Sequence, residues 1–303
     1  MKIKLNPIVK KDLKVTARSM RLSWGLFAYE AILAMAFLLV LVIIQENSYG
    51  FYSYGNVYSD MVYIFPVIAI VQVCIVALIV PIITASSISG EKERQTFDIM
   101  LTTCMSPLAI VVGKVTSAVI RILFFVVGSL PIMALSFVVG GLKWSSLFYY
   151  ILSIILLAII SGSIGILCSA FSRKTITAVI MSFGVYSLVY GMTFLPLLIK
   201  MFLTNGDHGG ESMLFLLFNP GVFFEEFFMH LLTNDMAILS NSPFPRKNIG
   251  TITYFLTQGS RWMYASIVAI LLLSFAFMLL AAWKVNPMHS SKGKRRKKKK
   301  EVD

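Results

Sequence analysis

Six long apolar runs limit what this sequence can fold into more than any other feature. They cover residues 24–44, 61–86, 108–139, 146–171, 176–198 and 262–283. A run of about 20 apolar residues can cross the hydrocarbon core of a bilayer as a helix, and a helix satisfies its own backbone hydrogen bonds there. Charged residues make up only 14% of the chain, against about 25% in soluble domains. We therefore predict an all-α membrane protein, a bundle of six membrane-spanning helices.

Lysine and arginine residues are unevenly divided between the segments that join these runs. They are frequent in residues 2–21, 92–94, 173–174 and 284–303, whereas residues 45–60 have none and residues 140–145 have only Lys143. Loops rich in Lys and Arg remain on the cytoplasmic side of a membrane. We expect a multi-pass protein of the plasma membrane with both termini in the cytoplasm.

The two ends of the chain carry most of its net charge of +13. Asn6-Pro7 is a good helix start, and apolar residues then recur on one face while cations line another. Residues 1–23 are therefore predicted to form a cytoplasmic amphipathic helix at the membrane interface, either an orientation anchor or a lever. The basic tail, residues 284–303, either contacts anionic membrane lipids or is solvated. Neither end indicates a nucleic-acid partner.

A charged segment, residues 89–106, separates the second apolar run from the third. Ser89 or Gly90 can start a helix, and the glutamates that follow suit its first turn. An apolar stripe at helical spacing comes next, made of Phe97, Met100, Leu101 and Cys104. We expect an amphipathic helix on the cytoplasmic side, ending at Ser106-Pro107. An ordinary polar loop is the alternative.

Two stretches of sequence resemble a known family. Residues 90–103 read Gly-Glu-Lys-Glu-Arg-Gln-Thr-Phe-Asp-Ile-Met-Leu-Thr-Thr, and residues 110–114 read Ile-Val-Val-Gly-Lys. With the intervening Ser106-Pro107, they resemble the coupling-helix region of permease subunits of type-2 ATP-binding-cassette exporters. Residues 6–14 resemble the opening of the same subunits, and the number of spans fits. Residues 24–283 would then be the transmembrane permease domain.

The resemblance implies a non-catalytic subunit that pairs with a second permease, as a homodimer or a heterodimer, and docks two ATPase subunits. The residues assigned to ATPase coupling on this basis are Gly90, Glu91, Lys92, Glu93, Arg94, Gln95, Thr96, Phe97, Asp98, Met100 and Leu101. The sequence has no Gly-x-x-x-x-Gly-Lys-Ser/Thr loop for phosphate binding. ATP and Mg²⁺ are therefore expected on the partner ATPase, and no cofactor on this chain.

Three ionisable residues inside the runs are candidates for an ion pair. Such residues cost about 2.5 to 3.5 kcal/mol each on insertion scales, so they usually have partners. We predict that Glu30 pairs with Lys114 or Arg121 and so ties the first span to the third. The alternative is that each side chain extends separately to the cytoplasmic surface.

Small residues repeat every fourth position in the fourth span, at Ser161, Gly165 and Ser169. This pattern lets another helix approach closely, either within the subunit or at a dimer seam. Cys74, Cys104 and Cys168 lack the paired spacing of a zinc or redox site and are interpreted as structural thiols.

The segment between the fifth and sixth spans, residues 200–260, is too long for a simple connector and is predicted to be extracellular and partly helical. Its helix begins at Asn219-Pro220 and is rich in phenylalanine. In the family that the chain resembles, such an element lies above the translocation path. We therefore expect an external gate made of Asn219, Pro220, Phe223, Phe224, Phe227 and Phe228; attachment to the outer interface is the alternative. Asp207, His208 and Glu211 are explained by an exposed Gly-rich loop, and no metal site is predicted.

Two other function classes are alternatives to a permease. Glu225-Glu226-x-x-x-His230 resembles in part the Glu-Glu-x-x-x-Arg motif of intramembrane prenyl endopeptidases, but the arginine and a further membrane-embedded histidine are missing. An ion-driven transporter or channel would need charges along a mid-membrane path, whereas Glu30, Lys114 and Arg121 lie toward one side. We predict an exporter permease, driven by ATP hydrolysis on another chain.

Overall fold

The computed structural model describes residues 9–10, 12, 14, 19–48, 61–97, 106–203, 210–233, 255–256 and 260–286. Most of these residues are helical, and none of them lies in a strand. The long elements are α2 (Met20–Ser48), α4 (Ile64–Glu93), α6 (Pro107–Val139), α7 (Trp144–Phe171), α8 (Thr175–Met192), α9 (Leu195–Leu203), the 3-10 helix η1 (Gly210–Phe218), α10 (Pro220–Thr233) and α13 (Arg261–Val285).

The six predicted spans are confirmed as helices. Within the described part of the chain, six helical stretches are long and apolar enough to cross a membrane, with α8 and α9 counted together as residues 175–199. A further apolar pair, Ser212–Phe218 and Pro220–Leu232, is bent by 92° at its break and would make a seventh span if it crossed as one unit. The all-α fold class of the prediction is therefore correct.

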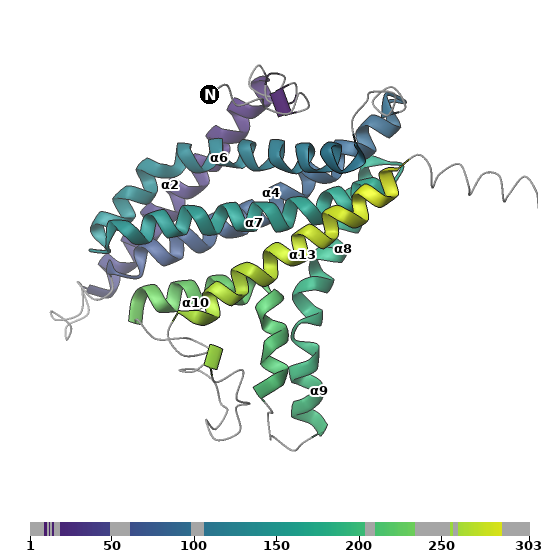
Figure 1. Cartoon of the computed structure of the whole chain (residues 1–303). Helices are drawn as coiled ribbons and strands as arrows, with labels where there is room; N and C mark the ends of the chain where they lie inside the picture. The colour runs from purple at the N-terminus through teal and green to yellow at the C-terminus, as the bar shows by residue number, and fades with distance from the viewer. Residues whose placement is uncertain are drawn as a thin grey trace, which may run out of the picture.

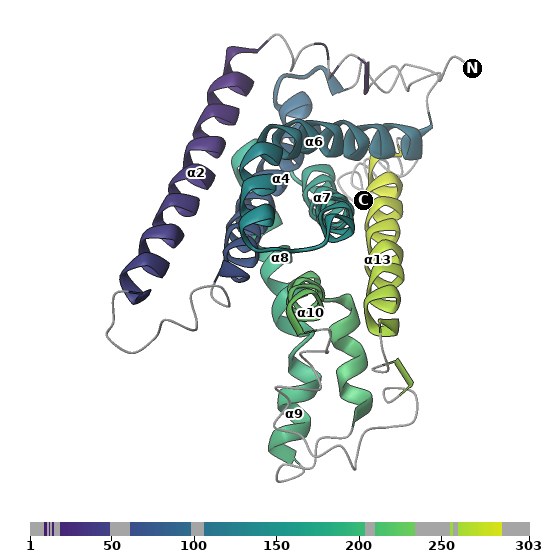
Figure 2. The ribbon, with the colours of Figure 1, turned by 90° about the vertical axis from the view of Figure 1, so that its left-hand side faces the viewer.

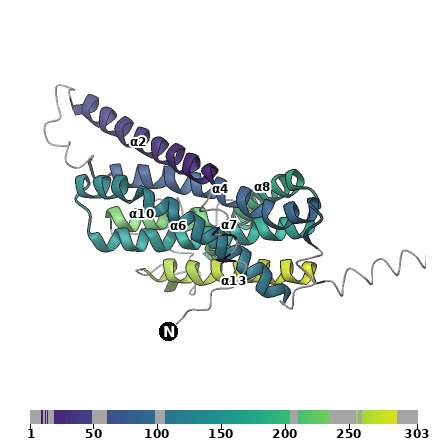
Figure 3. The ribbon, with the colours of Figure 1, turned by 90° about the horizontal axis from the view of Figure 1, so that it is seen from above.

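Helix α7 lies at the centre of the bundle. In the most apolar part of α7, 72% of residues are buried, against 11% in α2 and 11% in the α8–α9 stretch. Helices α4, α6, α8 and α13 all pack against α7, and Figure 3 shows α7 between α4 and α13. Helix α2 contacts α4 and α6 at the edge of the bundle, and Figure 2 shows it tilted away from the other helices.

The small residues of α7 allow α4 to approach it closely. A Cβ atom added at Gly165 would lie 1.9 Å from Thr84 Oγ1 and 3.2 Å from the amide nitrogen of Ala85. One turn later, Ser169 Oγ accepts hydrogen bonds from the amides of Ile88, at 3.0 Å, and Ser89, at 2.8 Å. Two of the three small residues singled out in the sequence thus face α4 of the same chain.

A buried polar network joins four helices and lies nearer to the starts of α4 and α7 than to their ends. Gln72 on α4 is fully buried, and its Nε2 donates to Ser129 Oγ on α6 at 3.1 Å. Tyr29 OH on α2 lies 3.4 Å from the same hydroxyl. Tyr150 OH on α7 lies 3.2 Å from Gln72 Oε1 and 3.1 Å from the carbonyl oxygen of Ala69. These side chains satisfy one another where apolar neighbours could not.

Candidate functional site

Helix α4 continues past the apolar part of the second span and carries the first residues of the charged segment. The prediction that a separate helix starts at Ser89 or Gly90 is wrong, because α4 runs unbroken to Glu93. Ser86 Oγ donates to the carbonyl oxygen of Ile83 at 2.9 Å, and Ser89 Oγ donates to that of Ala85 at 2.6 Å. Both hydroxyls thus bond back along the same helix instead of capping a new one.

Helix α4 ends in a turn of the Schellman type. Gln95 has a φ of 59°, in the left-handed region. The Gln95 amide donates to the carbonyl of Lys92 at 3.1 Å, and the Thr96 amide donates to that of Glu91 at 2.9 Å, which is the hydrogen-bond pattern of this motif. Glycine is the usual residue at the left-handed position, so the sequence did not indicate this end. Asp98, Met100, Leu101 and Cys104 lie outside the described residues.

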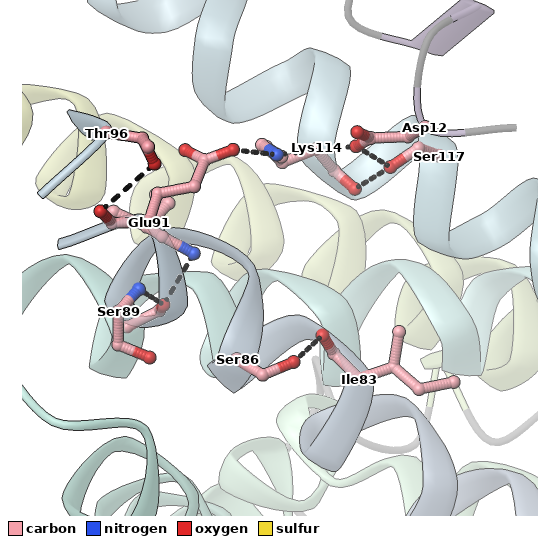
Figure 4. A network of polar contacts seen from close by, with 10 residues as sticks. Asp12, Ile83, Ser86, Ser89, Glu91, Thr96, Lys114 and Ser117 are labelled. Atoms are coloured by element: carbon pink, nitrogen blue, oxygen red, sulfur yellow. Dashed lines mark hydrogen bonds and ion pairs between the residues drawn. The ribbon is translucent and has the colours of Figure 1, made fainter. Parts of the chain in front are cut away.

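Two carboxylates share one buried lysine beside this turn (Figure 4). Lys114, in the second turn of α6, has a side chain that is only 5% exposed. Its Nζ lies 2.8 Å from Glu91 Oε1 and 3.4 Å from Asp12 Oδ2. Ser117 Oγ donates to the same Asp12 oxygen at 3.3 Å. These contacts join the N-terminal segment to the end of α4 and the start of α6.

The predicted pairing of Glu30 with Lys114 or Arg121 is wrong. Glu30 instead lies against Gly128, where an added Cβ would be 2.8 Å from Glu30 Oε1. Gly128 is 14 residues beyond Lys114, which is about 21 Å along a helix. Helix α2 begins beside the middle of α6 (Figure 1). Glu30, early in α2, and Lys114, early in α6, therefore lie at different depths in the bundle. Among the described residues, Glu30 Oε1 and Arg121 Nε have no hydrogen-bond partner.

Two adjacent residues of α4 bind the ends of two other helices. Lys92 Nζ donates to the carbonyl oxygens of Ala170, Ser169 (3.4 Å) and Ser172 (3.3 Å) at the end of α7. Glu93 Oε2 accepts from the amide and the hydroxyl of Thr175, at 3.2 and 2.6 Å, at the start of α8. A cation at a helix C-terminus and an anion at an N-terminus both suit the helix dipole. The order of residues in the sequence alone could not indicate these partners.

We call this region, residues 86–97, 106–117, 169–175 and 284, the polar end of the bundle. Within it, the side chains of Glu91 and Lys92 are partly buried by their contacts with the bundle, whereas Arg94, Gln95 and Thr96 are exposed. Phe97 is half-buried, with its ring centroid 5.5 Å from Lys92 Nζ. The exposed turn after Glu93 is therefore the described part of the charged segment that another protein could contact.

The predicted gate residues lie away from the polar end, in α10 (Figure 1). All four phenylalanines, Phe223, Phe224, Phe227 and Phe228, are buried, and the rings of the last two lie 6.3 Å from that of Tyr150 on α7. Asn219 Nδ2 donates to the carbonyl of Tyr190 at 3.1 Å and to Thr193 Oγ1 at 2.8 Å, and its Oδ1 accepts from the Gly221 amide. Asn219 thus joins the start of α10 to the end of α8.

The site expected of a Glu-Glu protease is not assembled. Glu225 is exposed and Glu226 is fully buried, so the two carboxylates face different surroundings. No three His, Cys, Asp or Glu side chains gather as a metal site in the part of the chain that the structure describes.

The comparisons agree with the helical bundle. The family model described as "ABC-2 family transporter protein" matches residues 6–284, whereas no curated protein matches the sequence. The match includes the polar end and every helix described above except the last residue of α13, Val285. This multi-pass membrane protein therefore belongs to the ABC-2 family of transporter proteins.

Proposed function

We propose that the chain is the permease subunit of an ATP-binding-cassette exporter and that a separate ATPase moves it through the polar end. One observation carries this proposal: the last turns of α4 are bonded directly to α6, α7 and α8, and through Lys114 of α6 to Asp12 of the N-terminal segment. A displacement of the turn that follows Glu93 would therefore reach four other parts of the chain at once.

Each connection has its own chemistry. The ion pair of Glu91 with Lys114 would transmit the displacement to α6, and Lys114 would pass it on to Asp12. The bonds of Lys92 and Glu93 to the ends of α7 and α8 would transmit it to the central helix and its neighbour. The exposed Arg94, Gln95 and Thr96 would contact the ATPase, while Glu91 and Lys92 would act inside the permease.

The charge distribution supports a cytoplasmic position for the polar end. Lys92, Arg94, Arg173, Lys174 and Lys284 all lie at or next to it, whereas Lys143 and Arg261 lie at the other ends of α7 and α13. Such an excess of cations is typical of the cytoplasmic side. ATP and Mg²⁺ would bind to the partner ATPase there, and a second permease subunit would complete the transporter.

We assign the external gate to α10. Its buried phenylalanines rest against Tyr150, which also belongs to the polar network around Gln72. A movement of α7 would therefore displace both the polar network around Gln72 and the gate. Asn219 would hold the gate to the end of α8 and keep it closed in the absence of ATP hydrolysis.

Labelling of single cysteines tests the orientation that this function requires. Arg94→Cys and Trp144→Cys place exposed thiols at opposite ends of the bundle, after Cys74, Cys104 and Cys168 are replaced by alanine. A membrane-impermeant maleimide should label the Trp144 variant in intact cells and the Arg94 variant only after the membrane is opened. Labelling of the Arg94 variant in intact cells would contradict the proposal.

A further inference from the structure

Three cations surround the last turn of α7. Lys92 Nζ binds its carbonyl oxygens, Arg173 follows it in the chain, and Lys284 Nζ from α13 lies 5.1 Å from the ring centroid of Phe171. Lys284 and Arg173 are also the charges that act most directly on Lys92. Three separate elements thus bring positive charge to one place.

No carboxylate in the described part of the chain pairs with Arg173 or Lys284. Both side chains are exposed, and among the described residues neither forms a salt bridge. The nearest carboxylate of α4 is Glu93, which is bound to Thr175 and is acted on by Lys174 and Arg94. Glu91 and Asp12 are paired with Lys114. An anion is therefore the ligand that the surplus charge would attract.

Apolar side chains lead up to these cations along α13. Leu273, Phe277 and Leu280 precede Lys284 by eleven, seven and four residues and so lie on the same side of the helix as Lys284. Leu280 is exposed, Phe277 and Leu273 are half-buried, and Phe171 beside Lys284 is also exposed. A ligand here would meet charge at one end and a long apolar surface below it.

We propose that Arg173 and Lys284 bind the phosphate of an anionic phospholipid, whose acyl chains lie along the side of α13 that carries Leu280 and Phe277. Basic sites between membrane helices on the cytoplasmic side suit such head groups. A free phosphate would use the charges but not the apolar face. Lys92 positions the site by fixing the end of α7, and its own ammonium is occupied by the helix carbonyls.

Native mass spectrometry of the purified full chain tests this site. The probes are phosphatidylglycerol and, as the neutral comparison, phosphatidylcholine with the same acyl chains. The wild type should retain phosphatidylglycerol preferentially. The double variant Arg173→Gln/Lys284→Gln should bind it about 30-fold more weakly, from roughly 1 kcal/mol per interfacial cation and a factor of 10 per 1.4 kcal/mol. Both residues are exposed, so the fold should be unchanged by circular dichroism.

The control is Lys143→Gln, which removes a cation at the other end of α7 and should leave binding unchanged. Equal retention of the two lipids by the wild type, or unchanged phosphatidylglycerol binding by the double variant, would overturn the proposal. Loss of a co-purifying ATPase by the double variant, with lipid binding intact, would also overturn it and assign the cations to protein docking. Failure of the lipid site with ATPase association intact would leave the proposed permease function standing.

Discussion

Lys114 Nζ on α6 lies 2.8 Å from Glu91 Oε1 on α4, at the point where the charged segment begins. Twenty-three positions separate the two residues in the sequence, and the stretch between them includes the exposed turn that we assign to ATPase contact. The ion pair joins the two ends of this stretch. It therefore fixes the contact turn to the bundle on both sides.

Lys114→Met should destabilise the bundle strongly. The change leaves Glu91 and Asp12 partly buried without their cation, a loss on the order of 3 kcal/mol for a pair at this level of burial. The triple variant Lys114→Met/Glu91→Gln/Asp12→Asn should recover much of the stability, because neither carboxylate is then left charged without Lys114. Thermal unfolding in detergent measures both. A triple variant no more stable than Lys114→Met would show that the charges are not the cause.

Gln95→Gly should leave α4 at least as stable, whereas Gln95→Val should weaken it. Gln95 has a positive φ, which glycine adopts freely and which costs other residues about 1–2 kcal/mol; a β-branched side chain is the least tolerant. Arg94→Val is the matched control, because Arg94 has a φ of −82°. The midpoint of thermal unfolding should rank the glycine variant above the valine variant, and the reverse order would rule out the left-handed turn.

Gly165→Ala should separate α4 from α7. The new methyl would meet Thr84 Oγ1 and the backbone of Ala85, and overpacking of this kind typically costs about 1–3 kcal/mol. Gly162→Ala is the control on the same helix, because its nearest neighbour atom would lie at an ordinary 3.6 Å. Folded yield after solubilisation should fall for the first variant only. Equal yields would mean that the two helices are not in such close contact.

Asn219→Asp and Asn219→Ala should separate the two roles of this side chain. Aspartate retains the oxygen that accepts from Gly221 but loses the donor to Tyr190 and Thr193, whereas alanine loses both. Each buried group left without its partner costs about 1–3 kcal/mol. If Asn219 holds the gate, both variants should admit a small fluorescent dye into sealed vesicles without ATP. A tight aspartate variant would assign only the helix cap to Asn219.

The number and type of spans could be predicted because they depend on local hydropathy, which the sequence displays directly. The depth of each helix relative to its neighbours could not be predicted, and this is why the predicted pairing of Glu30 with Lys114 or Arg121 is wrong. The boundary at Ser89 was also misplaced, since serine side chains serve equally as caps and as groups bonded within a helix. The contacts of Lys92 and Glu93 depend on the turn between α7 and α8, which lies some 80 residues further along the chain.

Photocrosslinking at Arg94 tests the central claim most directly. A photoreactive phenylalanine analogue at Arg94 in cells that express the full transporter should crosslink this chain to an ATPase subunit, identified by mass spectrometry. The same analogue at Trp144, exposed at the opposite end of the bundle, should give no such product. An ATPase crosslink from Trp144 and none from Arg94 would contradict the account.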